Sequence, residues 1–353
     1  MRGMERIDQI LADMQYGDAV SDNALAIRTK LRAMGKKSEI YAENIHPLLY
    51  HEVKPLSSYQ PGGTVLHHFA IGSDSNHFVL TLSGVRKILI YHNITPAHFF
   101  EGYNLKSELS CEKARIELQQ CAGRYDMALA VSEYNKRELE DYGFTNVRVL
   151  PIIYSFNRLN VTPDSAVLKQ FGQGNKKNIL FLGRIAPNKK QQDVVKAFYY
   201  YKTLINPDSR LLLVGSYHGM EKYANEISHL IAMLKLEDVY LTGQVTANQM
   251  TAYYQVSDLF LSMSEHEGFC VPLLESMFFD LPILAYDSSA VGETLGKAGI
   301  LFTKKDFKLV AEMMHLMLSD DHLRKKIISG QRKRLSDFSE DMIAKRLETY
   351  LTE

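Results

Sequence analysis

The chain has 353 residues, of which 46% are hydrophobic and 23% are charged, with 41 basic and 41 acidic side chains. This length suits two domains of ordinary size better than a single core. The formal net charge of zero gives no support to a general nucleic-acid partner. The three cysteines are widely spaced without a CxxC pair, which fits a reduced, cytoplasmic protein and predicts no metal cluster. Because no segment approaches the length of a membrane span, we expect no spanning helix.

Short apolar runs alternate with helical patterns through the first half of the chain, which predicts a parallel sheet. Strands are expected at 6–11, 38–42, 63–69, 87–91, 125–131 and 147–151, and helices at 24–34, 107–120 and 132–142. The loop after the first strand carries Gly17 but not the full G-x-G-x-x-G, so a dinucleotide fingerprint is not present. An ordinary turn with Asp18 or Ser21 as the helix cap explains this loop equally well.

His92 follows directly after the strand predicted at 87–91. A lone histidine is usually structural, but ligands of open α/β sheets bind at the carboxyl ends of the strands. This placement favours a functional role for His92. His67 and His68 lie within a predicted strand and fit the core or the wall of a cleft better. The polar segment 157–164 marks a linker between domains.

The second half repeats the alternation, with strands expected at 178–183, 210–216, 239–245, 258–261 and 300–302. Arg184 and Lys189 follow the first of these strands, five residues apart, and this pair could clamp a diphosphate. Lys190 next to them fits a solvated loop charge better.

The stretch 262–275 reads SMSEHEGFCVPLLE and joins an apolar strand to a helix with Pro in its first turn. A helix N-terminus in such a loop suits an anionic or hydroxyl-rich ligand. Glu267 and Glu275 flank the loop, and carboxylates commonly hold the hydroxyls of a sugar or ribose. For Glu275 alone, a capping or exposed glutamate explains the position equally well. Cys270 fits a small apolar filler better than a reactive thiol.

The Glu267–Glu275 spacing, the pair Arg184 and Lys189 after a glycine, and the segment at 292–294 together resemble the family-4 retaining glycosyltransferases. The resemblance is to the type that builds bacterial surface polysaccharides, including lipopolysaccharide. It implies the GT-B fold, an α/β architecture of two Rossmann-like doubly wound domains facing across a cleft. The domains are expected at 1–160 on the acceptor side and 161–335 on the nucleotide-sugar side, with a helix in 336–353 crossing back to the first domain.

The same resemblance implies transfer of a hexose, with retention of configuration, from a UDP- or GDP-linked sugar to a glycan or lipid-linked acceptor. Arg184 and Lys189 would stabilise the departing diphosphate, Glu267 would hold the sugar hydroxyls and Glu275 the ribose, and His92 would orient the sugar. The remaining donor-binding residues would be Gly17, Gly215, Gly243, Gln244, Val245, Gly268, Phe269, Cys270 and Val271. No DxD-like dipeptide lies at a strand end, so neither a metal nor a cofactor is expected.

Two other functions stay open: a nucleotide-sugar epimerase of the same fold, and a non-catalytic nucleotide-sugar-binding subunit of a transferase complex. The cellular location is also open in part. Basic residues gather on and after the first helix, at Arg28, Lys30, Arg32, Lys36 and Lys37. They are either solvated charges on a core-packed helix or a basic face that rests on the inner membrane from the cytoplasmic side.

Overall fold

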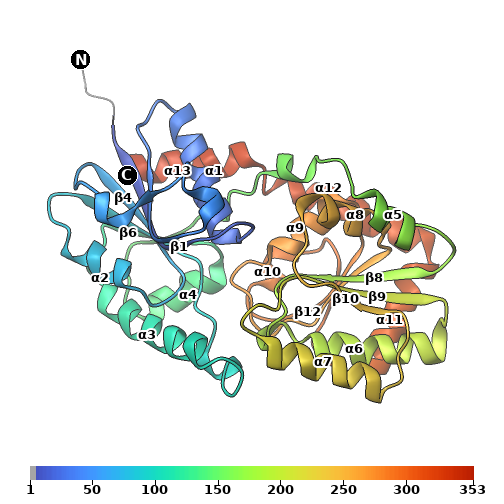
Figure 1. Ribbon diagram of the computed structural model, residues 1–353. Coiled ribbons are helices and arrows are strands. Elements are labelled where there is room, and N and C mark those ends of the chain that lie inside the picture. The colour runs from blue at the N-terminus through green and yellow to red at the C-terminus, as the bar shows by residue number, and fades with distance from the viewer. Residues whose placement is uncertain (1–4) are drawn as a thin grey trace. The chain divides into compact units, whose positions relative to one another are not determined.

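The computed structural model describes residues 5–353, which form two compact units, each built on a parallel sheet (Figure 1). Unit 1 contains the residues through Glu101, Leu105–Ser155 and Phe338–Glu353. Unit 2 contains Phe156–Asp337 and the short segment Gly102–Asn104. Among the described helices, none is both long enough and apolar enough to cross a bilayer.

Unit 1 has a seven-stranded sheet in the order β3-β2-β1-β4-β5-β6-β7. The strands are β1 (Ile7–Met14), β2 (Ile40–Ile45), β3 (Lys54–Pro55), β4 (Thr64–Phe69), β5 (Arg86–Tyr91), β6 (Met127–Ala130) and β7 (Val147–Val149). The α-helices are α1 (Ala19–Ala33), α2 (Asp74–Thr81), α3 (Leu105–Cys121), α4 (Glu133–Asp141) and α13 (Glu340–Thr352). Single 3₁₀ turns lie at η1 (Pro47–Leu49), η2 (Leu56–Ser58) and η3 (Ala97–Phe99).

Alternate residues of β1 face opposite sides of the sheet and build two separate cores. Leu11 packs in a cluster that includes Ala24 of α1. Its neighbour Ile10 packs in a second cluster that includes Val79 of α2. Helices α1 and α2 therefore cover opposite faces of the sheet, which is the doubly wound arrangement expected from the sequence.

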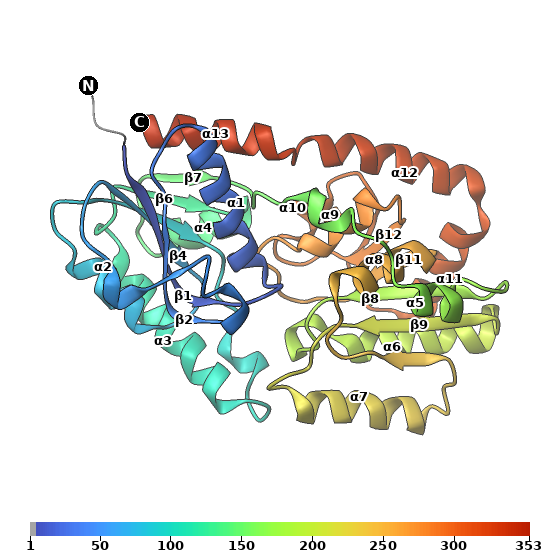
Figure 2. The ribbon, with the colours of Figure 1, turned by 45° about the horizontal axis from the view of Figure 1, so that its top comes forward.

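The last helix of the chain, α13, belongs to unit 1 and lies along it in Figure 2. Arg86 of β5 donates hydrogen bonds to the carbonyls of Leu351 and Tyr350 at the C-terminal end of α13. At the other end of the helix, Lys30 of α1 lies 2.9 Å from Asp341. A cation at the C-terminus of a helix and carboxylates at its N-terminus both interact favourably with the helix dipole. These contacts therefore stabilise α13 on unit 1.

Unit 2 has a six-stranded sheet in the order β10-β9-β8-β11-β12-β13. The strands are β8 (Lys177–Leu182), β9 (Ser209–Val214), β10 (Val239–Leu241), β11 (Leu259–Ser262), β12 (Ile283–Tyr286) and β13 (Ile300–Phe302). The α-helices are α5 (Ser165–Phe171), α6 (Gln191–Tyr200), α7 (Glu221–Met233), α8 (Ala247–Val256), α9 (Val271–Phe278), α10 (Val291–Leu295), α11 (Phe307–Ser319) and α12 (Asp321–Ser336). Shorter turns are η4 (Phe156–Leu159), η5 (Pro187–Lys189) and the π-helical η6 (Tyr201–Ile205). Figure 1 shows α6, α7 and α11 on one face of the sheet and α5, α8 and α9 on the other.

The strand order of unit 2 reverses between β8 and β11. The chain first runs outward from β8 to β9 and β10, and then returns to place β11 on the other side of β8. Loops leaving two such strands diverge to opposite faces of the sheet and open a crevice between them, which is where ligands of this architecture bind. The crevice of unit 2 is therefore bounded by the loops after β8 and β11.

The structure corrects several expected boundaries. Helix α1 begins at Ala19 rather than Ala24, because the Asp18 carboxylate accepts hydrogen bonds from the backbone N–H groups of Val20 and Ser21 and caps it. Unit 2 begins at Phe156, before the expected linker. The ring of Phe156 stacks on Phe278 with the centroids 5.4 Å apart, which ties that segment to α9.

Candidate functional site

Most of the candidate residues of the second half lie at the carboxyl edge of the unit 2 sheet. Arg184 and Lys189 lie in the segment after β8, and the segment after β11 contains Glu267. Gly215 and Gly243 follow β9 and β10. Because all these strands are parallel, their loops emerge at one edge, and the two loops beside the crevice hold the cations and the first glutamate.

Lys189 and Glu267 form an ion pair across the crevice. The Nζ atom of Lys189 lies 2.5 Å from Oε2 of Glu267. The two side chains are 22% and 10% exposed, so the pair is largely shielded from water. A shielded pair of this kind is held in one geometry more firmly than a surface pair, and it offers a cation and a carboxylate side by side to a ligand.

Backbone hydrogen bonds hold the two loops together around this pair. Asn188 donates from its side-chain amide to the carbonyl of His266 at 3.1 Å, and its own carbonyl accepts from the N–H of Glu265 at 2.8 Å. The N–H of Glu267 donates to the hydroxyl of Ser289 at 2.8 Å. Glu267 is thus fixed through its backbone from the loop after β12 as well as through its carboxylate.

Glu275 lies in the second turn of α9 and is 5% exposed, which excludes the exposed-glutamate interpretation. The hydroxyl of Tyr254 in α8 donates to its Oε2 at 2.7 Å. Tyr254 is itself buried and stacks on Phe279. Because a carboxylate can accept several hydrogen bonds, a residue of this kind suits a ligand that presents hydroxyl groups.

Three glycines bring the ends of β8, β9 and β10 into close contact. Gly215 has φ +147°, and a Cβ atom built on it would lie 2.0 Å from the carbonyl oxygen of Gly183. Its N–H donates to the carbonyl of Gly243 at 3.2 Å. Only glycine fits at position 215, because a side chain there would push β9 away from β8 at the point where the loop with Arg184 and Lys189 begins.

The other expected donor-site residues of unit 2 differ in exposure. Arg184 and Gln244 are exposed, Val245, Gly268 and Val271 are half-buried, and Phe269 and Cys270 are buried. The carbonyl of Phe269 accepts from the Thr294 hydroxyl of α10 at 2.6 Å. Cys270 has φ +72° at the start of α9, and burial raises the pKa of its thiol well above the usual value. The thiol is therefore a neutral filler, and a reactive role is not supported.

Lys190 is not the solvated charge that the sequence suggested. Its Nζ atom lies 3.1 Å from Glu265, and Lys305 lies 2.8 Å from the same carboxylate and 2.9 Å from Asp193. Although burial works in the opposite direction, the ammonium groups of Lys305 and Lys190 hold the pKa of Glu265 below its usual value. This network ties the loop after β11 to α6 beside the candidate site.

In unit 1, Gly17 and His92 both follow the carboxyl ends of parallel strands. Gly17 is exposed in the β1–α1 turn with φ +77°. His92 extends the ladder beyond β5, since its N–H donates to the carbonyl of Phe69 at 2.9 Å. Its ring stacks on His68 with centroids 5.1 Å apart and planes 13° apart.

Three histidines lie close together in unit 1, of which His67 and His68 are buried and His92 is half-buried. Burial lowers the pKa of His92 to about 3, and it lowers the pKa of His67 to about 3 as well. Burial, together with the neighbouring His92 and His67, also lowers the pKa of His68 well below its usual value. All three rings are therefore neutral at physiological pH.

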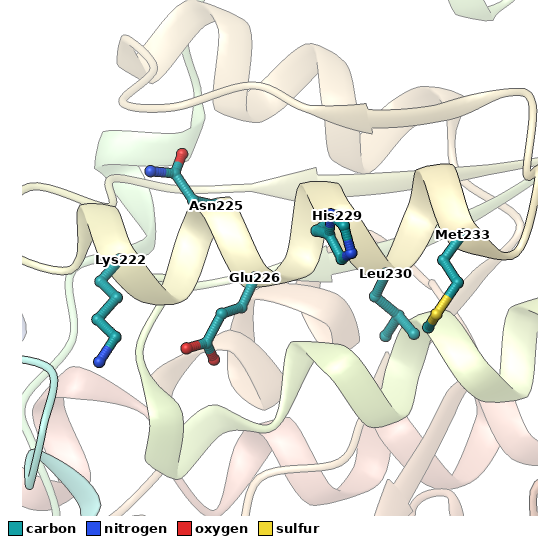
Figure 3. A pocket seen from close by; sticks show the side chains of 6 residues that line it. All are labelled: Lys222, Asn225, Glu226, His229, Leu230 and Met233. Carbon is teal, nitrogen blue, oxygen red and sulfur yellow. The ribbon is translucent and has the colours of Figure 1, made fainter.

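A shallow cavity of about 720 Å³ lies elsewhere on unit 2, along the outer side of α7. Figure 3 shows its lining side chains: Lys222, Asn225, Glu226, His229, Leu230 and Met233. None of them belongs to the carboxyl edge of the sheet. Within residues 5–353, no cluster of His, Cys, Asp and Glu has the arrangement of a metal site.

Comparison with known proteins gives concordant matches. The family model "Glycosyl transferases group 1" matches residues 167–334, which lie within unit 2. N-acetyl-alpha-D-glucosaminyl L-malate synthase of Bacillus anthracis is 29% identical over 235 residues, covering 64% of this chain and 58% of that protein. The capsular polysaccharide biosynthesis glycosyltransferase CapM of Staphylococcus aureus is 25% identical over 174 residues, covering 48% of this chain and 44% of that protein. The chain thus spans about half the length of these two relatives.

Among solved structures, HepE of Anabaena in complex with UDP-glucose matches with a TM-score of 0.78 at 17% identity. The match covers 98% of this chain and 99% of that one, so the two share their fold over both units.

Proposed function

Because residues 167–334 match the model of the glycosyl transferases group 1 family and the chain has the GT-B fold that its sequence predicted, we propose that it moves a hexose from a nucleotide diphosphate sugar to the hydroxyl of an acceptor. The observation that carries the proposal is the Lys189–Glu267 pair at the point where the strand order of unit 2 reverses. A cation for phosphate and a carboxylate for hydroxyl groups lie there side by side.

The cations act on the leaving group. When the bond between the sugar and the diphosphate breaks, negative charge grows on the phosphate oxygens. Arg184 and Lys189 stabilise that charge, and a contact that strengthens in the transition state accelerates the reaction. Arg184 suits this role because it is exposed and its planar guanidinium can bind two phosphate oxygens at once.

The carboxylates act on the two hydroxyl-rich parts of the donor. Glu267 accepts hydrogen bonds from the transferred sugar, and Glu275, oriented by Tyr254, accepts them from the ribose. Gly215, Gly243, Gln244, Val245, Gly268, Phe269, Cys270 and Val271 complete the donor site, the last four lining the start of α9. For Gly17 and His92 of unit 1, the roles toward the diphosphate and the sugar rest on the resemblance to family-4 enzymes alone.

We further propose that the donor is a UDP- or GDP-linked sugar, that the anomeric configuration is retained, and that no metal or cofactor is required. The UDP-glucose bound to HepE supports the choice of nucleotide sugar. Retention follows from the resemblance to family-4 enzymes. The two protein cations support metal independence, since they already offer positive charge to the leaving group.

The acceptor is a glycan or a lipid-linked sugar in cell-surface polysaccharide synthesis. The capsular polysaccharide role in the name of the Staphylococcus aureus relative supports this class of product. A reaction on the cytoplasmic side of the membrane would suit such acceptors.

The basic face proposed for membrane contact has less support. Arg28 is buried and pairs with Glu52, Lys30 lies 2.9 Å from Asp341, Arg32 lies 3.1 Å from Glu39, and Lys36 pairs with Glu5. Lys37 is exposed. With four of the five cations beside carboxylates, little net positive charge faces solvent there, and a peripheral contact would need another surface.

Binding of a panel of donors tests the proposal. A nucleotide sugar that binds the native state raises the midpoint of thermal unfolding by mass action. We expect stabilisation by one class among UDP-, GDP- and ADP-sugars, and its loss in Arg184→Ala. Release of nucleoside diphosphate by the purified chain separates a transferase from a non-catalytic binding subunit. Recovery of an epimerised nucleotide sugar would favour the epimerase instead.

A further inference from the structure

Gln9, His68 and His92 form a hydrogen-bonded chain of side chains in unit 1. Nε2 of His68 lies 2.9 Å from Oε1 of Gln9, and Nδ1 of His68 lies 2.8 Å from Nε2 of His92. Gln9 is 0% exposed and His68 is 2% exposed. The first two residues lie on the adjacent parallel strands β1 and β4, and His92 follows β5, so three neighbouring strands fix the chain.

The direction of these hydrogen bonds is set at Gln9. Its Nε2 group lies 3.0 Å from the carbonyl oxygen of Ala24, and because that oxygen can only accept, it must face the amide N–H of Gln9 rather than the amide oxygen. The opposite amide orientation would set two acceptors against each other. Oε1 of Gln9 therefore faces His68 and accepts a hydrogen bond from it.

One tautomer of each histidine follows. His68 must carry its proton on Nε2 in order to donate to Gln9. Because burial keeps the ring neutral, Nδ1 of His68 is then an acceptor. His92 must donate to it, and so carries its own proton on Nε2. Burial also keeps His92 neutral, which leaves Nδ1 of His92 without a proton.

Nδ1 of His92 is buried and has no hydrogen-bond partner among residues 5–353. A buried acceptor without a partner costs free energy that a donor hydroxyl would recover. We propose that Gln9 and His68 are positioning residues that hold His92 as the Nε2–H tautomer, so that it meets the donor sugar as an acceptor of a hydroxyl hydrogen bond at Nδ1. This inference rests on the proposed function for the identity of the ligand.

The backbone after His92 is held as firmly as the ring. Asn93 has φ +85°, and its side-chain amide donates to Asn135 at 2.9 Å. The N–H of Ile94 donates to the hydroxyl of Tyr91 at 3.2 Å, and its carbonyl accepts from Arg115 at 2.8 Å. This turn fixes the backbone that carries His92, and the ring itself is held by its stacking and hydrogen bond with His68.

The tautomer can be measured directly on the ligand-free protein. In protein labelled with ¹⁵N-histidine, the nitrogen chemical shifts distinguish a protonated from an unprotonated ring nitrogen. The His92 signals are those that disappear in His92→Gln. We expect the Nε2–H form of a neutral ring in the wild type, and a shift toward the other tautomer in Gln9→Met, whose side chain has a similar size but no acceptor.

Variants of His68 test the positioning role. His68→Leu removes the acceptor for His92, whereas His68→Asn places a carbonyl oxygen at the position of Nδ1. We expect the kcat/KM for the donor to fall about tenfold in His68→Leu, the equivalent of about one hydrogen bond, and to stay within about threefold in His68→Asn. The nitrogen shifts of His92 should change in the first variant and stay in the second.

Two results would overturn the inference. One is an Nδ1–H tautomer or a protonated His92 ring in the wild type near neutral pH. The other is an unchanged His92 tautomer in both Gln9→Met and His68→Leu. Absence of transfer with every sugar donor would contradict the proposed function. The nitrogen chemical shifts are measured without substrate, so they would still decide whether Gln9 and His68 set the tautomer of His92.

Discussion

Lys189 and Glu267 are 78 positions apart in the sequence, and their side chains meet at 2.5 Å between the loops that follow β8 and β11. The contact joins the cation expected at the diphosphate to the carboxylate expected at the sugar. Since both side chains are largely shielded, removing one partner leaves an uncompensated charge, and this effect on stability can be separated by mutation from the effect on the proposed chemistry.

Lys189→Met removes the ammonium group that pairs with the buried carboxylate of Glu267. We expect the free energy of unfolding to fall by about 2 kcal/mol. The double variant Lys189→Met/Glu267→Gln removes both charges and should recover most of that loss, yet neither variant should transfer sugar. Urea unfolding and a transfer assay measure the two effects. The exposed pair of Arg332 with Asp280 is the control, and Arg332→Met should cost less than about 1 kcal/mol. Restored transfer in the double variant would argue against the roles given to both residues.

Tyr254→Phe tests the ribose site without changing a residue in contact with the ligand. Removing the hydroxyl that donates to Glu275 loosens the carboxylate, and we expect the KM for the donor to rise about fivefold while kcat stays within about twofold. The neighbouring Tyr253→Phe is the matched control. Equal donor KM values for the two variants would mean that Glu275 does not depend on Tyr254.

The sequence predicted the described strands of both sheets except β3 and β12, because buried parallel strands are continuous apolar runs with few other interpretations. Helix α8 was missed although its start carries a readable signal, the capping box of Thr246 with Gln249. Helix α7, which lacks a side-chain cap, was also missed.

The candidate site was predictable only where the spacing along the chain carries the chemistry. Arg184, Lys189, Glu267 and Glu275 lie in loops and helix starts whose motifs are local. Gln9, His68 and Tyr254 were not predicted as functional, since their importance depends on partners far away in the sequence. No local pattern marks a strand residue that hydrogen-bonds across a sheet.

Stability should decrease on acidification because of the buried histidines. Unfolded histidines bind protons below pH of about 6.5, whereas His67 and His92, with pKa values of about 3, stay neutral in the folded state. The unfolded state then holds more protons, so each buried histidine lowers the free energy of unfolding by up to about 1.4 kcal/mol per pH unit between about 6.5 and 3. His67→Gln should make urea unfolding less dependent on pH between about 5 and 7, with the exposed His98→Gln as the control. An unchanged pH dependence in His67→Gln would mean that His67 is protonated in the folded protein.

Transfer should survive removal of divalent cations. If Arg184 and Lys189 supply the positive charge for the leaving group as proposed, the rate in EDTA should stay within about twofold of the untreated rate. Loss of activity in EDTA with recovery on adding magnesium or manganese would show that the two side chains are insufficient.

The central claim is tested most directly by following the sugar and the nucleotide in one reaction. Purified protein is mixed with radiolabelled UDP- or GDP-sugar and an extract of bacterial lipid-linked glycans, and both glycan label and released nucleoside diphosphate are counted. The account predicts equal amounts of the two products, and a rate at least about a hundredfold lower in Arg184→Ala, which remains folded. Absence of nucleotide release with every donor, or an Arg184→Ala rate within about twofold of the wild type, would contradict it.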